Sequence, residues 1–61
     1  MPSDTPARRI LVVEDEALVA MLVEDALEDA GFGVIGPVRS VAQALELLEA
    51  EAPDAAVLDL N

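Results

Sequence analysis

The sequence predicts an α/β fold in which three short parallel strands alternate with two helices, in the order β-α-β-α-β. The run Ile10–Val13 lacks polar alternation, as a strand of a parallel sheet covered on both faces does, and Phe32–Ile35 and Ala55–Leu58 are two further short apolar runs. Between these runs lie two segments whose apolar residues recur at helical spacing. Helices that connect consecutive buried strands give a parallel sheet with right-handed crossovers.

The first strand is expected at Ile10–Val13, followed by a helix from about Glu16 to Ala30. Gly31 stands where a left-handed residue would end that helix. Phe32–Ile35 is the second expected strand, and Gly36-Pro37 breaks it. The apolar face of the first helix is predicted to consist of Val19, Leu22, Val23, Ala26, Leu27 and Ala30.

The second helix is expected to open at Ser40, with Gln43 three residues later as its capping box. Pro53-Asp54 ends this helix, and Ala55–Leu58 forms the third strand. The predicted apolar face of this second helix consists of Val41, Ala44, Leu45, Leu48 and Ala52.

Composition excludes several classes of function. With 61 residues, 54% of them hydrophobic, the chain forms at most one small globular domain. Three basic against 13 acidic residues give a formal charge of −10, which disfavours nucleic acid and anionic membranes as partners. The sequence lacks Cys, His and Lys, so thiol and Schiff-base chemistry and the usual general base are absent, and we expect no independent enzyme activity. No apolar run approaches the ~20 residues of a membrane span, so the cytoplasm is the expected location.

Three carboxylates stand at the expected strand ends. Glu14 and Asp15 follow the first strand, and Asp59 follows the third. Ligands of open parallel sheets bind outside the carboxyl ends of the strands, so these acids should meet there if the first and third strands are neighbours. Their mutual repulsion would be relieved by a hard divalent cation such as Mg²⁺. The alternative is purely structural: acids that favour a helix N-terminus, and a turn residue at the end of a strand.

The motifs ILVVEDE (Ile10–Glu16) and AAVLDLN (Ala55–Asn61), with the helix and the GP-terminated strand between them, resemble the receiver domain of two-component response regulators. The resemblance implies one half of a flavodoxin-like, doubly wound parallel sheet with strand order 2-1-3. Residues 1–8 would be a flexible N-terminal tail, and residues 9–61 the N-terminal half of a receiver.

The resemblance also implies a role for each candidate site residue. Asp59 would be the phosphoacceptor, taking a phosphoryl group from a phosphohistidine on a histidine kinase or a histidine phosphotransfer protein. The metal site would consist of Glu14, Asp15, Asp59 and Asn61. Asp15 would ligate Mg²⁺ directly, Glu14 would act largely through water, and Asn61 would offer its backbone carbonyl.

The chain departs from the family pattern in its length. The hydroxyl residue after the fourth strand and the lysine after the fifth, which bind the phosphoryl group in receivers, lie beyond Asn61. The uncharged strand Ala55–Leu58 would then have an open edge, a template for association. A second reading is therefore a half-receiver that self-associates or binds a partner without phosphate, and we expect the fragment to be a homo-oligomer.

Overall fold

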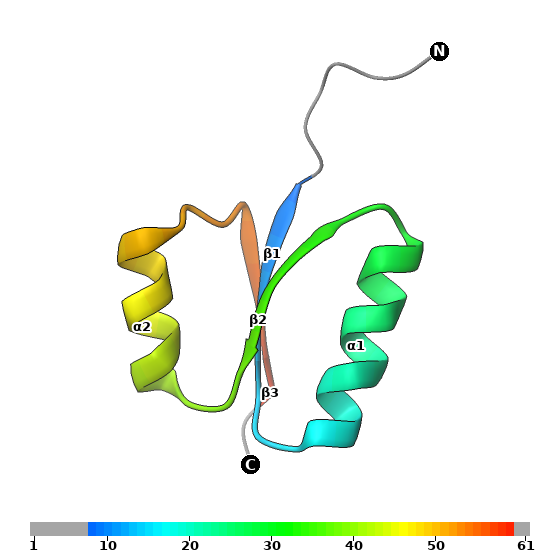
Figure 1. Ribbon diagram of the computed structural model, residues 1–61, viewed down its shortest axis with the longest axis horizontal. Helices are drawn as coiled ribbons and strands as arrows, with labels where there is room; N and C mark the ends of the chain where they lie inside the picture. The colour runs from blue at the N-terminus through cyan, green and yellow to red at the C-terminus, as the bar shows by residue number, and fades with distance from the viewer. Residues whose placement is uncertain (1–7, 60–61) are drawn as a thin grey trace.

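The computed structural model describes residues 8–59. Its elements follow the order β1 (Arg9–Glu14), α1 (Ala17–Asp29), β2 (Gly33–Val38), α2 (Val41–Ala50) and β3 (Ala55–Asp59). The strands are parallel and form one sheet in the order β2-β1-β3 (Figure 1). The predicted α/β class, element order and strand order are confirmed. All of the expected tail except Arg8 falls outside the described residues.

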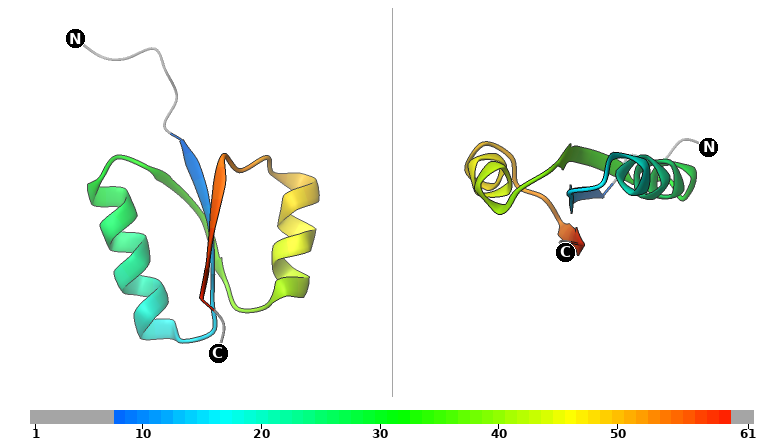
Figure 2. Two further views of the ribbon diagram at one scale, coloured as in Figure 1. Left: turned by 180° about the vertical axis from the view of Figure 1, so that it is seen from behind. Right: turned by 90° about the horizontal axis from the view of Figure 1, so that it is seen from below.

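The two helices lie on opposite faces of the sheet (Figure 2). Helix α1 packs on β1 and β2, whereas α2 packs on β1. The first connection, through α1, leads from β1 to β2, and the second, through α2, leads back past β1 to β3. Because both crossovers have the same hand but run in opposite directions across the sheet, their helices lie on opposite faces. Across residues 8–59, neither helix has the length and apolar character needed to cross a bilayer.

The core is centred on β1, the middle strand. Leu11, Val12 and Val13 are its fully buried side chains. Leu11 and Val13 pack with Ile35 of β2 and Ala44 of α2. Because side chains alternate along a strand, Val12 points to the other face, the one that α1 covers. The unbroken apolar run of β1 is thus explained by cover from both sides.

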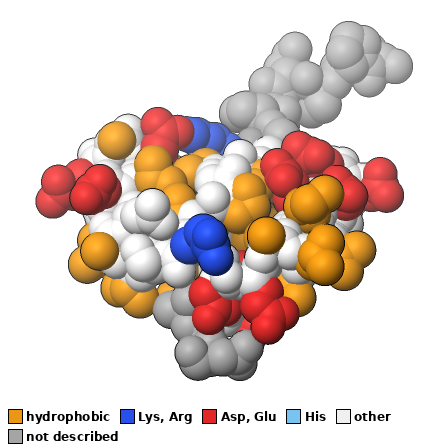
Figure 3. Space-filling view, turned by 60° about the horizontal axis from the view of Figure 1, so that its bottom comes forward, with side chains coloured by type: hydrophobic (Ala, Val, Ile, Leu, Met, Phe, Trp, Pro, Cys, Tyr) orange, Lys and Arg blue, Asp and Glu red, His pale blue; other side chains and the backbone are white. Residues whose placement is uncertain are grey.

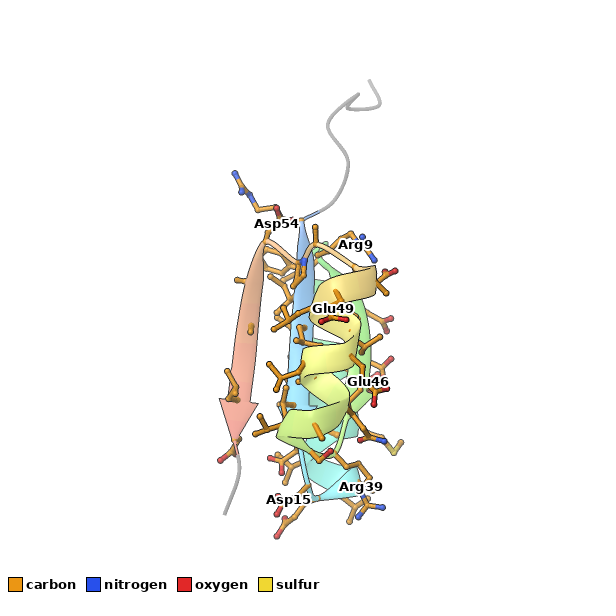
Figure 4. The ribbon with its side chains drawn as sticks, turned by 90° about the vertical axis from the view of Figure 1, so that its left-hand side faces the viewer. Arg9, Asp15, Arg39, Glu46, Glu49 and Asp54 are labelled. Atoms are coloured by element: carbon orange, nitrogen blue, oxygen red, sulfur yellow. The ribbon has the colours of Figure 1, made fainter. Side chains whose placement is uncertain are left out.

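Strand β3, by contrast, is exposed along its whole length. It pairs with β1 on one side, and Leu58 remains 60% exposed. In Figure 4, α2 lies over the other two strands and leaves β3 uncovered beside it. The open, uncharged edge expected from Ala55–Leu58 is therefore present in the described part of the chain.

Strand β2 runs further than its sequence predicts. It continues past Gly36-Pro37 to Val38, and the register with β1 shifts between the pairs Leu11–Ile35 and Val13–Val38. Pro37 has no N–H to donate to the ladder, and Gly36 adopts a φ of +95° that a side chain would oppose. The Gly-Pro pair therefore forms an irregularity within the strand rather than its end.

The helix faces differ in part from those predicted. The buried helical side chains are two alanines, Ala20 of α1 and Ala44 of α2. Leu22, expected on the core face, is 70% exposed. The larger apolar side chains of the helices are partly buried, as is Leu47, which packs against the core, or exposed, as is Leu22.

Candidate functional site

The ends of β1 and β3 bring two of the candidate acids side by side. Glu14 is the last residue of β1, Asp59 is the last residue of β3, and the two are register partners in the parallel pair. Parallel strands share one carboxyl edge, so residues far apart in sequence meet there. The structure thus places the phosphoacceptor candidate directly beside Glu14, the first acid of the acidic motif.

Glu14 is a buried acid, with only 3% of its surface exposed. Its Oε2 accepts a hydrogen bond of 2.9 Å from the backbone N–H of Glu16. That bond favours the charged carboxylate and by itself lowers the pKa of Glu14. Burial and the neighbouring carboxyl groups of Asp15 and Asp59 outweigh it, so the pKa of Glu14 is raised above its ordinary value. The ionised form of Glu14 is therefore less favourable here than in water.

Asp15 lies in the loop between β1 and α1. Its Oδ1 is buried and accepts no hydrogen bond within the described residues. A buried oxygen left unpaired is costly, and such an atom in a native fold points to an ion or ligand that would complete it. The backbone carbonyl of the same residue does have a partner, because Arg39 Nη2 donates to it at 3.1 Å.

Arg39 is the site residue that the sequence reasoning missed. It lies just after β2, at the same end of the molecule as Asp15 (Figure 4). Its backbone N–H donates to Gln43 Oε1 at 2.9 Å, and the N–H of Gln43 donates to Ser40 Oγ at 3.2 Å. The predicted cap of the second helix is thus present, and it also fixes the backbone of Arg39. The available signal was that this is the chain's one basic residue outside its N-terminal segment.

The donor set fits a hard divalent cation, although its members within the described part of the chain do not form a complete metal site. Between residues 8 and 59, no three acidic side chains are grouped closely enough to hold an ion as they stand. Asn61, the fourth ligand candidate, lies outside the described residues. The unpartnered Oδ1 of Asp15 and the raised pKa of Glu14 both indicate a place where positive charge would be stabilised. Oxygen donors of this kind suit Mg²⁺.

The surrounding surface combines acidic and basic groups. Figure 3, with this end of the molecule turned forward, shows acidic side chains gathered beside a basic one. The N-cap position of α1 is Glu16, whose side chain makes no capping hydrogen bond. Glu16 therefore stands at the N-terminus of α1 without a capping hydrogen bond, and a position near a helix N-terminus does not account for the burial of Glu14.

A parallel sheet of order 2-1-3, with acids at the ends of β1 and β3, defines a receiver-type half-domain. Comparison with known families agrees: residues 10–61 match the family described as the response regulator receiver domain. The chain belongs to that family. No solved structure gave a significant match.

Three curated relatives show the range of proteins that contain such a segment. The chain is 37% identical to the chemotaxis protein CheY of Bacillus subtilis, over 90% of this chain and 46% of the relative. It is 36% identical to the transcriptional regulatory protein PdtaR of Mycobacterium tuberculosis, over 88% of this chain and 26% of the relative. It is 42% identical to a protein-glutamate methylesterase/protein-glutamine glutaminase of Archaeoglobus fulgidus, over 87% of this chain and 15% of the relative. The chain thus spans less than half the length of each relative.

Proposed function

We propose that this chain is the phosphoacceptor part of a response regulator, with Asp59 as the residue that becomes phosphorylated. The observation that supports the proposal is the pairing of Asp59 with Glu14 at the shared carboxyl edge of β1 and β3. Asp59 is exposed, so a donor can approach it, whereas Glu14 beside it is buried. Membership of the receiver family supports the same role.

The chemistry assigned to Asp59 is nucleophilic. A carboxylate oxygen of Asp59 forms a bond to phosphorus while the bond between phosphorus and the donor nitrogen breaks, giving an acyl phosphate. Asp15 and Glu14 would hold Mg²⁺, with Asp59 itself and the backbone carbonyl of Asn61 completing the set proposed from the resemblance. When bound, Mg²⁺ supplies positive charge that offsets the charge of the phosphoryl oxygens.

The proposed partner is the phosphohistidine of a histidine kinase or a histidine phosphotransfer protein. The relatives are named as chemotaxis and transcriptional regulatory proteins, which is consistent with a signalling role. We further propose that the chain acts in the cytoplasm, turns over no substrate of its own and binds no nucleic acid. Its charge of −10 supports the last point.

The test is phosphorylation by a small acyl-phosphate donor in the presence of Mg²⁺, read by intact mass and by mapping of the modified peptide. Asp59→Asn should abolish incorporation. Glu46→Gln is the matched control, because it also removes one carboxylate, at an exposed position on α2 remote from the site (Figure 4). Incorporation that survives Asp59→Asn, or that is lost equally in the control, would contradict the assignment.

A second candidate function is association without phosphate. The observation that favours it is the full exposure of β3, with Leu58 turned outward on the side of the sheet where Val13 packs against α2. An exposed apolar edge strand is a template for pairing with another chain. Phosphate uptake separates the two candidates, because only the first requires a reactive Asp59.

A further inference from the structure

We infer that Arg39 is a positioning residue that clamps the loop between β1 and α1 and thereby holds Asp15 at the acidic edge of the sheet. The observation is the hydrogen bond from Arg39 Nη2 to the backbone carbonyl of Asp15, at 3.1 Å. It joins two loops that are 24 residues apart in the sequence. One loop follows β1 and the other follows β2, so the clamp ties the ends of neighbouring strands together.

The loop between β1 and α1, to which Arg39 donates, contains groups that are unfavourable in its observed conformation. Asp15 Oδ1 is buried without a partner among the described residues, and the buried carboxyl of Glu14 lies beside two further acids. Both features favour rearrangement of the loop towards water, since an unpaired buried oxygen and like charges each destabilise the closed form. A bond from a charged donor to the backbone of this loop opposes that rearrangement.

The clamp itself is built on a rigid support. The backbone N–H of Arg39 is bonded to Gln43 Oε1, and Gln43 is bonded in turn to the Ser40 hydroxyl that caps α2. The guanidinium is therefore carried on backbone that the first turn of α2 fixes. Among the three basic residues of the chain, Arg9 and Arg8 precede or begin β1, at the opposite end of the sheet.

Two physical roles for Arg39 make opposite predictions for Mg²⁺ binding. If the guanidinium acted only by its charge, it would repel a divalent cation, and its removal would tighten binding at low salt. If it acts as a clamp, its removal frees the loop and weakens binding, because Asp15 must then be ordered by the metal. At about 1 M NaCl the Debye length is only ~3 Å, so the effect of the charge is screened and that of the clamp remains.

The first measurement needs no metal. Amide hydrogen exchange is compared in the whole chain and in Arg39→Met, which keeps the aliphatic stem and removes all donors. Glu16 N–H donates to Glu14 Oε2 within the loop, so its exchange reports loop opening. We expect it to accelerate about threefold to tenfold, the scale of one solvent-exposed hydrogen bond, while exchange at Val12 and Val13 in β1 is unchanged. Equal acceleration at all three positions would show general destabilisation and would overturn the clamp.

The second measurement is Mg²⁺ affinity by titration calorimetry in about 1 M NaCl. Arg39→Met should bind the ion about threefold to tenfold more weakly than the unsubstituted chain, again the scale of one such bond. Arg8→Ala is the control, because it removes the same charge and its side chain makes no ion pair or hydrogen bond within residues 8–59. Tighter or unchanged binding in Arg39→Met would overturn the clamp.

A second variant keeps the inference testable if Arg39→Met does not fold. Arg39→Gln remains polar, but its side chain is uncharged and shorter than that of arginine, so it should still speed exchange at Glu16. Unchanged exchange in a folded Arg39→Gln would then overturn the clamp. The inference rests on the proposed function only in its metal measurement. No Mg²⁺ binding by the unsubstituted chain, together with Arg39-dependent exchange, would contradict the proposed metal site and leave the clamp supported.

Discussion

Glu14 and Asp59 face each other across the β1–β3 pair at the point where both strands end, and Glu14 is the buried member of the pair. Burial and the neighbouring carboxyl groups disfavour the charged form of Glu14. The pKa of Glu14 is therefore raised, in spite of the hydrogen bond from the N–H of Glu16. The free energy of unfolding should consequently depend on pH through this residue.

Glu14→Gln should stabilise the fold at neutral pH. Because the folded-state pKa of Glu14 is raised above its ordinary value of 4.5, the folded chain binds this proton more tightly than the unfolded chain. The corresponding stability is fully present below pH 4.5 and is lost as the pH rises through the folded pKa. Glutamine keeps the acceptor for Glu16 N–H and cannot ionise, so its advantage should grow from pH 4 towards pH 7.

Urea unfolding, followed by circular dichroism, measures the difference in free energy of unfolding between Glu14→Gln and the unsubstituted chain across the pH range. Mg²⁺ should reduce the advantage of Glu14→Gln, because a bound cation would stabilise the ionised Glu14. Glu49→Gln, at an exposed position on α2, is the control and should show little dependence on pH. An advantage that is constant with pH would mean that ionisation of Glu14 has no part in it.

The bulge in β2 predicts a specific cost for a side chain at Gly36. An added Cβ would lie 2.8 Å from the backbone N of Val38 and 3.2 Å from the carbonyl oxygen of Val12, on a residue with φ of +95°. Gly36→Ala should therefore destabilise the fold by about 2–4 kcal/mol, the sum of a left-handed backbone and a clash with rigid backbone.

Gly31→Ala is the matched control for that substitution. Gly31 has a φ of +94°, and an added Cβ would meet nothing within 4 Å. It should cost only about 1 kcal/mol, the left-handed conformation alone. Chemical denaturation of the two variants side by side gives the comparison. Equal costs would show that the close approach at Gly36 is relieved by movement of the strands.

A cluster at the opposite end of the sheet should support stability but not the proposed chemistry. The backbone of Arg9 donates to Asp54 Oδ2 at 2.7 Å, and the N–H of Asp54 donates to the carbonyl of Arg9 at 2.8 Å. The Arg9 side chain also pairs with Glu51. Asp54→Ala should destabilise by about 1 kcal/mol, one exposed charge-assisted bond, and Glu51→Gln by less than about 1 kcal/mol.

Both variants should keep the Mg²⁺ affinity of the unsubstituted chain, because Asp54 and Arg9 lie at the end of the sheet remote from Asp15 (Figure 4), and Glu51 pairs with Arg9. Calorimetric titration checks this, provided that circular dichroism shows each variant to be folded. A loss of affinity comparable with that of Arg39→Met would contradict the separation of the two ends.

Much of the fold is predictable from the sequence because its signals are local. The buried run Ile10–Val13, the left-handed Gly31 and the cap at Ser40 each depend on a few neighbouring residues, and the structure contains all three. The meeting of Glu14 with Asp59 is not local. It follows from a general rule of parallel sheets when the first and third strands are neighbours.

Other features were not predictable because they depend on how elements are oriented in three dimensions. The exposure of Leu22 depends on which strands lie beneath α1, and helical spacing alone does not carry that information. The contact of Arg39 with Asp15 depends on the paths of two loops, one after β1 and one after β2. Side-chain contacts between loops leave no periodic pattern in the sequence.

The last prediction is that the 61-residue polypeptide self-associates through β3. Residues Ala55–Asp59 are all exposed, and the strand is paired with β1 on one side. Leu58 and Val57 project to opposite faces, so a second copy could cover apolar surface on both. A two-fold pairing of β3 edges is the simplest closed arrangement, and a stable interface buries about 800 Å² per partner. The charge of −10 opposes assembly, so salt or Mg²⁺ should strengthen it.

Sedimentation at micromolar concentrations measures this association, and Leu58→Lys tests its location. A lysine on an edge strand opposes pairing, so this variant should shift the chain towards monomer. Ala42→Lys adds the same charge at an exposed position on α2 and should leave association unchanged or slightly stronger, since it reduces the net negative charge. A compact monomer whose cooperative unfolding is independent of concentration would refute the prediction. Association that Leu58→Lys leaves intact would instead assign it to another face, such as the exposed flank of α1 around Leu22.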